Sequence, residues 1–260
     1  MQTVLDAFDS ISLADLKARA NLMRRRDTKY VLGRAELQAF LAAQTEDYEV
    51  LEIAGQNRFQ YSSSYLDSPD LHTFFDHNQG RRRRFKIRFR HYHETGLYFF
   101  EIKLKGFRNE TLKYRLPTDK AAYEQPELPA HLLQFANQKL QKHYHMTLTY
   151  PLCRSVRVDY IRSTLVAKQG AERITIDNEI GFYGSQGAEY LPADRFVVEL
   201  KSALGRSVAD RWLWRHQAHP VKRCSKYGMG VNLLKLPEQN TRFRPIIRRY
   251  FIEAARAGSA

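Results

Sequence analysis

The sequence predicts an α+β fold in which an antiparallel sheet closes into a barrel with a charged lumen and helices cover its outside. Three observations support this prediction. Several segments alternate charged and apolar residues with a period of two, which puts the two kinds of side chain on opposite faces of a strand. The charged positions are mostly Arg and Lys, whereas an ordinary solvent face mixes both signs of charge with polar residues. Helical segments stand before, between and after the strands, and they can cover the apolar outside of a barrel.

The composition indicates a folded protein with a concentrated positive charge. The chain has 260 residues, 43% of them hydrophobic, which is enough for one large domain or at most two. Its formal net charge is +14, and residues 81–115 alone contain twelve Lys and Arg against three Glu. Charge that is concentrated in this way predicts a localised anionic partner.

Cysteine content and hydropathy favour an intracellular protein. Cys153 and Cys224 are the only cysteines, too few for a disulfide framework and without the spacing of metal ligands. The N-terminal segment lacks a secretory apolar core, and no apolar run approaches the roughly 18 residues needed to cross a membrane. We therefore expect a cytoplasmic protein with two reduced thiols that does not itself span a membrane.

Two helices are expected near the N-terminus. The segment SLADLKARANL (12–22) has a helical spacing of apolar residues, and Ser12 is a suitable N-cap. The segment GRAELQAFLAAQ (33–44) is expected to form the second helix.

Strands dominate the middle of the chain, because alternation coincides there with ring and β-branched side chains. They are expected at 48–53, 58–67, 84–92, 97–105, 111–116, 153–166, 172–180 and 195–202. A helix is expected at 126–140, and two amphipathic helices at 207–217 and 243–257. The prediction is therefore seven or eight strands, joined mainly in antiparallel order.

The stretch RRRRFKIRFRHY (81–92) shows the alternation most clearly. From residue 84 cations and apolar residues take turns, with Arg84, Lys86, Arg88 and Arg90 against Phe85, Ile87 and Phe89. The charged faces of later strands carry Glu101, Lys103, Lys113, Arg115, Arg173, Asp177, Glu199 and Lys201.

Two architectures are compatible with this pattern. In the simpler one, an open antiparallel sheet turns its apolar face inward and its charged face to water. In the favoured one, the charged faces line a closed lumen, because like charges on neighbouring strands destabilise a sheet unless an anion lies between them. The planar fork of Arg also contacts phosphate oxygens at two points. The expected ligand is a dense linear anion.

Acids among these cations are candidate metal ligands. Glu199 and Glu101 are the best placed and Asp177 is third, because carboxylates hold divalent ions that bridge phosphate oxygens. An ion pair with a neighbouring Lys or Arg is the alternative role for each acid. For Asp177 the ion pair is the favoured role.

Nine segments in order resemble the vacuolar transporter chaperone (VTC) domain family, which belongs to the triphosphate tunnel metalloenzymes of the CYTH-like superfamily. They are RRDTKYVL (25–32), SSSYLDSPD (62–70), RFKIRFRHY (84–92), FFEIKLK (99–105), LKYR (112–115), VDYIRST (158–164), RITID (173–177), VVELKS (197–202) and SKYGMGV (225–231). The resemblance implies an eight-stranded antiparallel tunnel that binds nucleoside triphosphate or polyphosphate with Mn²⁺ or Mg²⁺. We expect a single domain over 1–260, with its core at about 20–235 and a C-terminal helix at 243–257.

The resemblance also implies roles for individual residues. Those expected to contact phosphates are Lys29, Arg88, Arg90, Lys103, Lys113, Arg162, Arg173 and Lys226, and Ser225 adds a hydroxyl contact. Lys201 joins them from its position on the charged face. Glu199 is expected to hold the metal, with Glu101 as the next acid, and Tyr160 to line the same face. The expected catalytic residues are Arg88, Arg90, Arg162, Lys226 and Glu199.

The expected activity is that of a polyphosphate polymerase, a phosphotransferase with ATP as donor, because eukaryotic members of the family make polyphosphate from ATP. Triphosphatases of the CYTH type begin with an ExExK strand whose acids hold the metal that assists attack by water. The corresponding RRDTK (25–29) keeps Lys29 but lacks both glutamates, which favours transfer over hydrolysis. An inorganic triphosphatase or nucleoside triphosphatase, and a non-catalytic polyphosphate-binding module, are the alternatives.

Nucleic-acid binding is not expected, although a net charge of +14 suggests it. A protein that binds single strands needs aromatic rings among its cations for base stacking, and in residues 84–92 the rings alternate away from the charges. The expected ligands are ATP or triphosphate and polyphosphate. A membrane-protein partner encoded elsewhere is compatible with the family.

Overall fold

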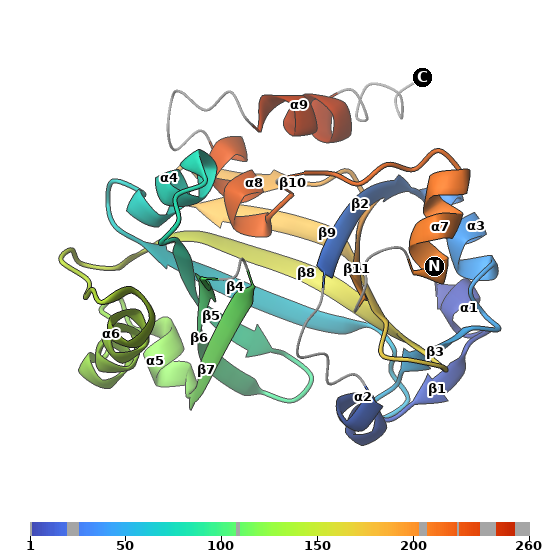
Figure 1. Cartoon of the computed structure of the whole chain (residues 1–260), viewed down its shortest axis with the longest axis horizontal. Helices are drawn as coiled ribbons and strands as arrows, with labels where there is room; N and C mark the ends of the chain where they lie inside the picture. The colour runs from blue at the N-terminus through green and yellow to red at the C-terminus, as the bar shows by residue number, and fades with distance from the viewer. Residues whose placement is uncertain are drawn as a thin grey trace.

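A computed structural model of the protein describes residues 2–19, 26–107, 110–202, 207–222, 224–234 and 243–252. These residues form an α+β fold around a large, strongly curved sheet (Figure 1). Eleven described strands join in this sheet, and eight of them form its main path in the order β2-β11-β9-β8-β4-β5-β6-β7. Every neighbouring pair on this path is antiparallel, as the sequence predicts.

The strands of the main path are β2 (Arg26–Gly33), β4 (Phe59–Asp67), β5 (Phe85–Tyr92), β6 (Leu97–Lys105), β7 (Thr111–Thr118), β8 (Cys153–Ala167), β9 (Arg173–Gly184) and β11 (Arg195–Ser202). Three short strands are β1 (Asp9–Ile11), β3 (Tyr48–Leu51) and β10 (Gly187–Tyr190). The longer helices are α2 (Leu13–Arg19), α3 (Arg34–Ala42), α4 (His72–Gln79), α6 (Ala130–Tyr144), α7 (Val208–Arg215) and α8 (Lys226–Leu233). Shorter helical segments are α1 (Gln2–Leu5), α5 (Lys120–Glu124), α9 (Arg244–Ile247) and the π-helical turn Arg248–Ile252.

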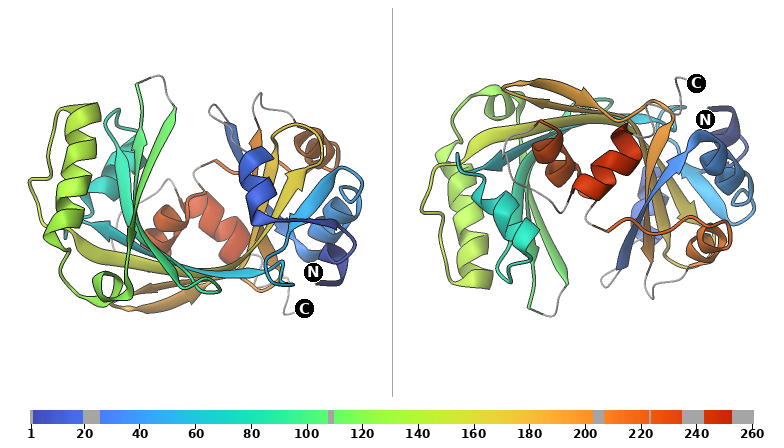
Figure 2. Two further views of the ribbon diagram at one scale, coloured as in Figure 1. Left: turned by 90° about the horizontal axis from the view of Figure 1, so that it is seen from below. Right: turned by 90° about the horizontal axis from the view of Figure 1, so that it is seen from above.

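The described strands do not close into a barrel. Among the described strands, β2 pairs only with β11 and β7 only with β6, so these two form the edges of the main path. Figure 2 shows a trough with β2 and β11 in one wall and β5, β6 and β7 in the other. The closed eight-stranded barrel is therefore not confirmed. Alternation decides which side chains share a face, whereas pairing of the first and last strands depends on long-range contacts that the pattern does not contain.

Helices α5 and α6 cover the outer side of one wall (Figure 1). One buried cluster contains Phe85, Ile87, Phe89, Phe100 and Ile102 of the strands together with Ala122, Leu132, Ala136 and Leu140 of the helices. The prediction that helices cover the apolar side of the strands is confirmed here. The charged residues of β5 and β6 consequently lie on the inner side of the trough, which is the concave face.

The opposite wall is covered in the same way by α1, α3 and α7. Phe196, Val198 and Leu200 of β11 pack in a buried cluster with Leu37 of α3 and Leu213 of α7. Burial of these alternate positions leaves the residues between them, which include the predicted metal ligand, on the concave face.

Helix α8 packs on the concave face, between the two walls (Figure 2). Its Tyr227 and Met229 join a buried cluster with Val156 of β8 and Phe182 of β9. Gly230 permits this close approach, because a Cβ there would lie 2.6 Å from Cγ1 of Val156 and 3.0 Å from Cδ1 of Phe182.

Several local predictions can be compared with the structure. The backbone N–H of Asp15 donates to Oγ of Ser12 at 3.1 Å, which confirms the N-cap. The C-terminal helix expected at 243–257 is represented by α9 and the π-helical turn, and the remainder lies outside the described residues. Both cysteines are free thiols, as expected. In the described part of the chain, no helix combines the length and apolar character needed to cross a membrane.

Candidate functional site

The concave face gathers the predicted site residues from seven strands and from the start of α8. They are Lys29 of β2, Arg88 and Arg90 of β5, Glu101 and Lys103 of β6, Lys113 of β7, Arg162 of β8, Arg173 of β9, Glu199 and Lys201 of β11, and Ser225 with Lys226 at α8. Burial has the largest effect on the pKa of Lys103 and lowers it. The next two effects come from the opposite wall, where the charge of Lys29 lowers this pKa and that of Glu199 raises it. The two walls therefore present their charges to each other.

Glu101 lies at the centre of a buried cation cluster in one wall. Arg88 contacts its Oε2 through Nε at 2.7 Å and through Nη2 at 2.6 Å. Nζ of Lys113 lies 2.7 Å from Oε1, and Nε of Arg90 lies 4.0 Å from Oε2. Burial would raise the pKa of Glu101, but these three cations hold it below its usual range. Glu101 therefore stays ionised and neutralises the arginines that the sequence assigns to phosphate.

Asp177 forms a second cluster at the start of α8. Arg162 contacts it at two points, with Nε 2.6 Å from Oδ1 and Nη2 2.8 Å from Oδ2. Nζ of Lys226 also contacts Oδ2. Burial would raise the pKa of Asp177, but the charges of Arg162 and Lys226 lower it. The favoured role of Asp177, an ion-pair partner, is confirmed.

Glu199 and Lys201 form a third, looser pair on β11. Nζ of Lys201 lies 3.1 Å from Oε2 of Glu199 and is, in the described part of the chain, the one cation within 4.0 Å of that carboxylate. Burial would raise the pKa of Glu199, but Lys201, Lys29 and Arg162 lower it well below its usual range. Burial lowers the pKa of Lys201 to about 8, against the opposing effect of Glu199.

Four cations at one end of the concave face have no acid within ion-pair distance among the described residues. This four-cation cluster consists of Lys29, Arg84, Lys86 and Lys103. Two of them donate to backbone carbonyls instead, Lys29 to Cys224 at 2.9 Å and Arg84 to Arg81 at 2.6 Å. Burial and then the neighbouring cations lower the pKa of Lys86 well below its usual range. Lys86 was not among the predicted site residues, although it shares the alternation with Arg84, Arg88 and Arg90.

Tyrosine rings of β4 and β8 lie beside the arginines of the concave face. The guanidinium of Arg90 is 5.7 Å from the ring centre of Tyr61, and its Nη2 donates to the hydroxyl of Tyr160 at 3.2 Å. Arg88 is 5.7 Å from the ring centre of Tyr65 and donates to its hydroxyl at 3.1 Å. The phenylalanines of β5 turn away from the charges as expected for residues 84–92, whereas the tyrosines of β4 and β8 lie beside the arginines. Of these tyrosines, only Tyr160 of β8 was predicted from the sequence.

Ser225 is the N-cap of α8, because its Oγ accepts a hydrogen bond from the backbone N–H of Gly228 at 3.0 Å. Its hydroxyl hydrogen is not used in that bond, so the predicted phosphate contact stays a prediction. Lys29 donates to the carbonyl just before this cap. The start of α8 is thereby tied to β2 on one side and, through Lys226, to β9 on the other.

Glu199 suits a divalent metal better than the other two acids. Glu101 and Asp177 use both carboxylate oxygens in ion pairs, whereas Lys201 contacts one oxygen of Glu199. In the ranges that the structure describes, no three His, Cys, Asp or Glu side chains form a ready set of ligands. Mg²⁺ is commonly held by one or two carboxylates together with substrate phosphates, and Glu199 fits that arrangement. Glu101 could act as a second ligand only after release of Arg88 or Lys113.

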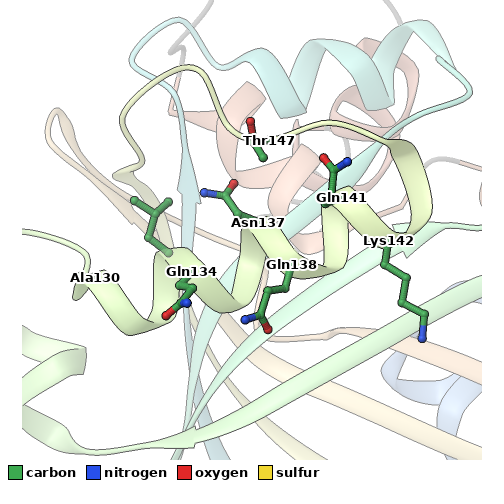
Figure 3. A pocket seen from close by; sticks show the side chains of 8 residues that line it. Ala130, Gln134, Asn137, Gln138, Gln141, Lys142 and Thr147 are labelled. Carbon is green, nitrogen blue, oxygen red and sulfur yellow. The ribbon is translucent and has the colours of Figure 1, made fainter.

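Two cavities open elsewhere on the surface. One of about 680 Å³ runs along α6 and is lined by Leu133, Gln134 and Gln141, among others (Figure 3). The other, of about 400 Å³, lies between α5 and β8 and is lined in part by Arg154 and Arg157. Neither includes a residue predicted from the sequence, so the concave face is the candidate site.

A comparison with protein families matches the family described as the VTC domain to residues 24–235. A search of curated proteins gives no match. The family match covers all the strands of the main path and α8.

Several solved structures match most of this chain at low sequence identity. A protein from Hippeastrum, whose name proposes an adenylyl cyclase and whose description reports a dominant triphosphatase activity, is 11% identical with a TM-score of 0.51 over 82% of this chain and 99% of that one. A protein from Vibrio parahaemolyticus named as a candidate adenylate cyclase is 16% identical with a TM-score of 0.43, over 79% of this chain and 97% of that one. The PH1819 protein from Pyrococcus horikoshii is 13% identical with a TM-score of 0.43, over 80% and 96% of the two chains.

Proposed function

The chain belongs to the VTC domain family, and we propose that it is a metal-dependent phosphotransferase that moves the γ-phosphate of ATP to a growing polyphosphate chain. The observation that carries the proposal is the four-cation cluster of Lys29, Arg84, Lys86 and Lys103. Burial and the neighbouring cations lower the pKa of Lys86 and Lys103, whereas Glu199 raises that of Lys29. Like charges that have no acid in ion-pair contact among the described residues favour binding of a dense anion. A linear phosphate chain has this charge density.

The cations paired with Glu101 and Asp177 have a different part in the proposal. The acids keep Arg88 and Arg162 in fixed positions while no ligand is present. A phosphate group that binds there replaces the carboxylate as the partner of the guanidinium. Such preorganised donors stabilise transition-state charge without reorganisation at the moment of reaction.

Phosphoryl transfer depends mainly on positioning and on charge neutralisation. Arg88, Arg90 and Arg162 hold the γ-phosphate, and Lys226 contacts it from α8. An oxygen of the terminal phosphate of the chain attacks the γ-phosphorus in line and forms the new P–O bond. The bond from the γ-phosphorus to the β–γ bridging oxygen breaks, and ADP leaves. Glu199 would hold a Mn²⁺ or Mg²⁺ ion, which would supply positive charge against the phosphates.

Hydrolysis of triphosphate is the second candidate function. The fold of the Hippeastrum protein is similar, and its description reports triphosphatase activity. Against hydrolysis, the sequence RRDTK (25–29) keeps Lys29 but lacks the paired glutamates that hold the water-activating metal in CYTH-type enzymes. Binding of polyphosphate without turnover is the remaining alternative. A cytoplasmic location, a single domain over the whole chain and a membrane-protein partner stay predictions from the sequence.

Incubation of the protein with ATP and Mn²⁺ or Mg²⁺ tests the proposal. A gel stained for polyphosphate and an assay for free phosphate are run on the same samples. Polymer supports the proposal, free phosphate without polymer assigns hydrolysis, and binding of triphosphate without either product assigns the binding module. Each outcome identifies one of the three functions.

Glu199→Gln separates catalysis from binding in the same assay. The substitution keeps the shape and removes one charge, so turnover should fall by about 10²–10³, the usual effect of one lost electrostatic contact to a transition state. Triphosphate should still bind, since a carboxylate that repels phosphate is gone. The matched control is Glu124→Gln on α5, where the side chain is 60% exposed outside the sheet. Unchanged turnover and metal dependence in Glu199→Gln would place the metal elsewhere.

A further inference from the structure

Asp67 at the end of β4 is a fully buried carboxylate that contacts no cation in the described part of the chain. Its Oδ1 accepts backbone N–H bonds from Ser68 and Thr73, both at 2.8 Å. Its Oδ2 accepts from the hydroxyl of Thr73 at 2.8 Å and from the N–H of Phe74 at 2.9 Å. Asp67 therefore anchors the first turn of α4 to the sheet.

The same Oδ2 also accepts a hydrogen bond from the hydroxyl of Tyr227, which lies on α8. The Tyr227 side chain is 1% exposed, and Ser155 donates to its hydroxyl at 3.5 Å. Burial and then the charge of Asp67 raise the pKa of Tyr227 above its usual range. The hydroxyl consequently keeps its proton and donates to Asp67. One carboxylate thus fastens both α4 and α8 to the end of β4.

Two branches lead from Tyr227 to the cations of the candidate site. Its ring stacks on Tyr65 with centres 4.9 Å apart and planes at 20°, and the Tyr65 hydroxyl accepts from Arg88 at 3.1 Å. In the chain, Tyr227 directly follows Lys226, whose amine contacts Asp177. Asp177 is also the ion-pair partner of Arg162. The bond from Tyr227 to Asp67 is therefore one of the contacts that hold α8 on the concave face.

We propose that Tyr227 is a positioning residue, which through its hydrogen bond to Asp67 holds Lys226 and Arg88 at the places where they contact a phosphate chain. The inference rests on the proposed function in one respect, that Lys226 and Arg88 bind phosphate. It adds a pair of residues that touch no phosphate themselves. Burial of both members and the five donors on one carboxylate distinguish this network from an ordinary core contact.

Two substitutions that each remove one hydroxyl donor from the same oxygen test the proposal. Tyr227→Phe removes the bond that holds α8, and Thr73→Val removes the bond that holds α4. Tyr227→Phe should weaken metal-free binding of inorganic triphosphate about tenfold, the equivalent of one hydrogen bond to a charged group. Thr73→Val should change the affinity by less than about twofold, although both variants lose thermal stability. Equal loss of affinity in the two variants would overturn the proposal.

A double-mutant cycle with Lys226→Met shows whether Tyr227 acts through its neighbour. In the Lys226→Met background, Tyr227→Phe should weaken triphosphate binding by about threefold or less, because one of the two positioned cations is already absent. A full tenfold effect in both backgrounds would mean that Tyr227 affects binding independently of Lys226, contrary to the inference.

Acylation of the Lys226 amine, followed by mass spectrometry, separates this inference from the proposed function. The Lys226 side chain is 13% exposed and engaged with Asp177, so it should react slowly in the wild type and in Thr73→Val. In Tyr227→Phe it should react several times faster. Faster reaction in a protein that binds no triphosphate would support the positioning role and contradict the proposed function. An unchanged rate would overturn the positioning role whatever the protein binds.

Discussion

Lys86 lowers the stability of the free protein but favours anion binding. It lies in the four-cation cluster, where burial and then Lys103 and Lys29 lower its pKa well below the usual range. A lysine that resists protonation in the folded state, with no acid within ion-pair distance among the described residues, costs stability that an anion would restore. Such conflicts are typical of binding sites, where function is retained at the expense of stability.

Lys86→Met should therefore raise the stability of the free protein and weaken anion binding. Removal of the buried amine should add about 1 kcal/mol to the free energy of unfolding, measured by denaturant titration in phosphate-free buffer. Triphosphate affinity should fall about tenfold. Lys142→Met on the outer helix α6 is the control and should change neither quantity. A destabilised Lys86→Met protein would show that the amine has a stabilising partner.

Lys201 gives the binding site a defined pH dependence. Its pKa is lowered by burial to about 8 from an ordinary value of 10.5, so the amine is charged at pH 7 and largely neutral at pH 9. Triphosphate prefers the charged form, and its affinity should fall as the pH rises through about 8. Lys201→Arg keeps its charge over this range and should lose that step, which isothermal titration between pH 7 and 9 can measure. Equal pH profiles for the two proteins would exclude Lys201 from the site.

The same shift has the opposite consequence for folding. Between about pH 8 and 10.5 the unfolded chain binds this proton and the folded chain does not. The contribution of Lys201 to stability therefore rises with pH through that window.

Helix α8 and strand β4 show how elements come to define the site. Helix α8 has two glycines in eight residues, KYGMGVNL, and glycine is a poor helix former, so its pattern does not predict a helix. In the fold Gly230 is needed, because it lets the helix approach Val156 closely. Strand β4 likewise places its tyrosines under the arginines of β5 through its register, with Tyr65 opposite Arg88. Tertiary contacts, not local propensity, position both elements.

The trough as a whole should respond to anions according to their charge. A ligand that binds only the folded state raises the melting temperature, and at a hundredfold excess over Kd inorganic triphosphate should raise it by about 5–10 °C. AMP has one phosphate and should raise it far less. Salt should weaken the effect, because many charge contacts contribute. Equal stabilisation by AMP and triphosphate, measured by thermal denaturation, would contradict a site for phosphate chains.

Sequence alternation was sufficient to assign the faces of the strands. It placed Arg88, Arg90 and Lys103 on one side and Phe85 and Ile87 on the other, because successive side chains of a strand point in opposite directions whatever the tertiary fold. The resemblance of nine ordered segments then identified the family, which the match over residues 24–235 confirms.

The tertiary structure determined what alternation along single strands cannot contain. Contacts between strands and helices far apart in the chain left β2 and β7 as open edges, laid α8 on the concave face and hydrogen-bonded Tyr227 to Asp67. The same contacts separate paired from unpaired cations. Glu101 and Asp177 neutralise some of them, whereas Lys86 has no acid within ion-pair distance among the described residues. Partner choice of this kind depends on distances across the folded molecule, and those distances exist only after the sheet has curved.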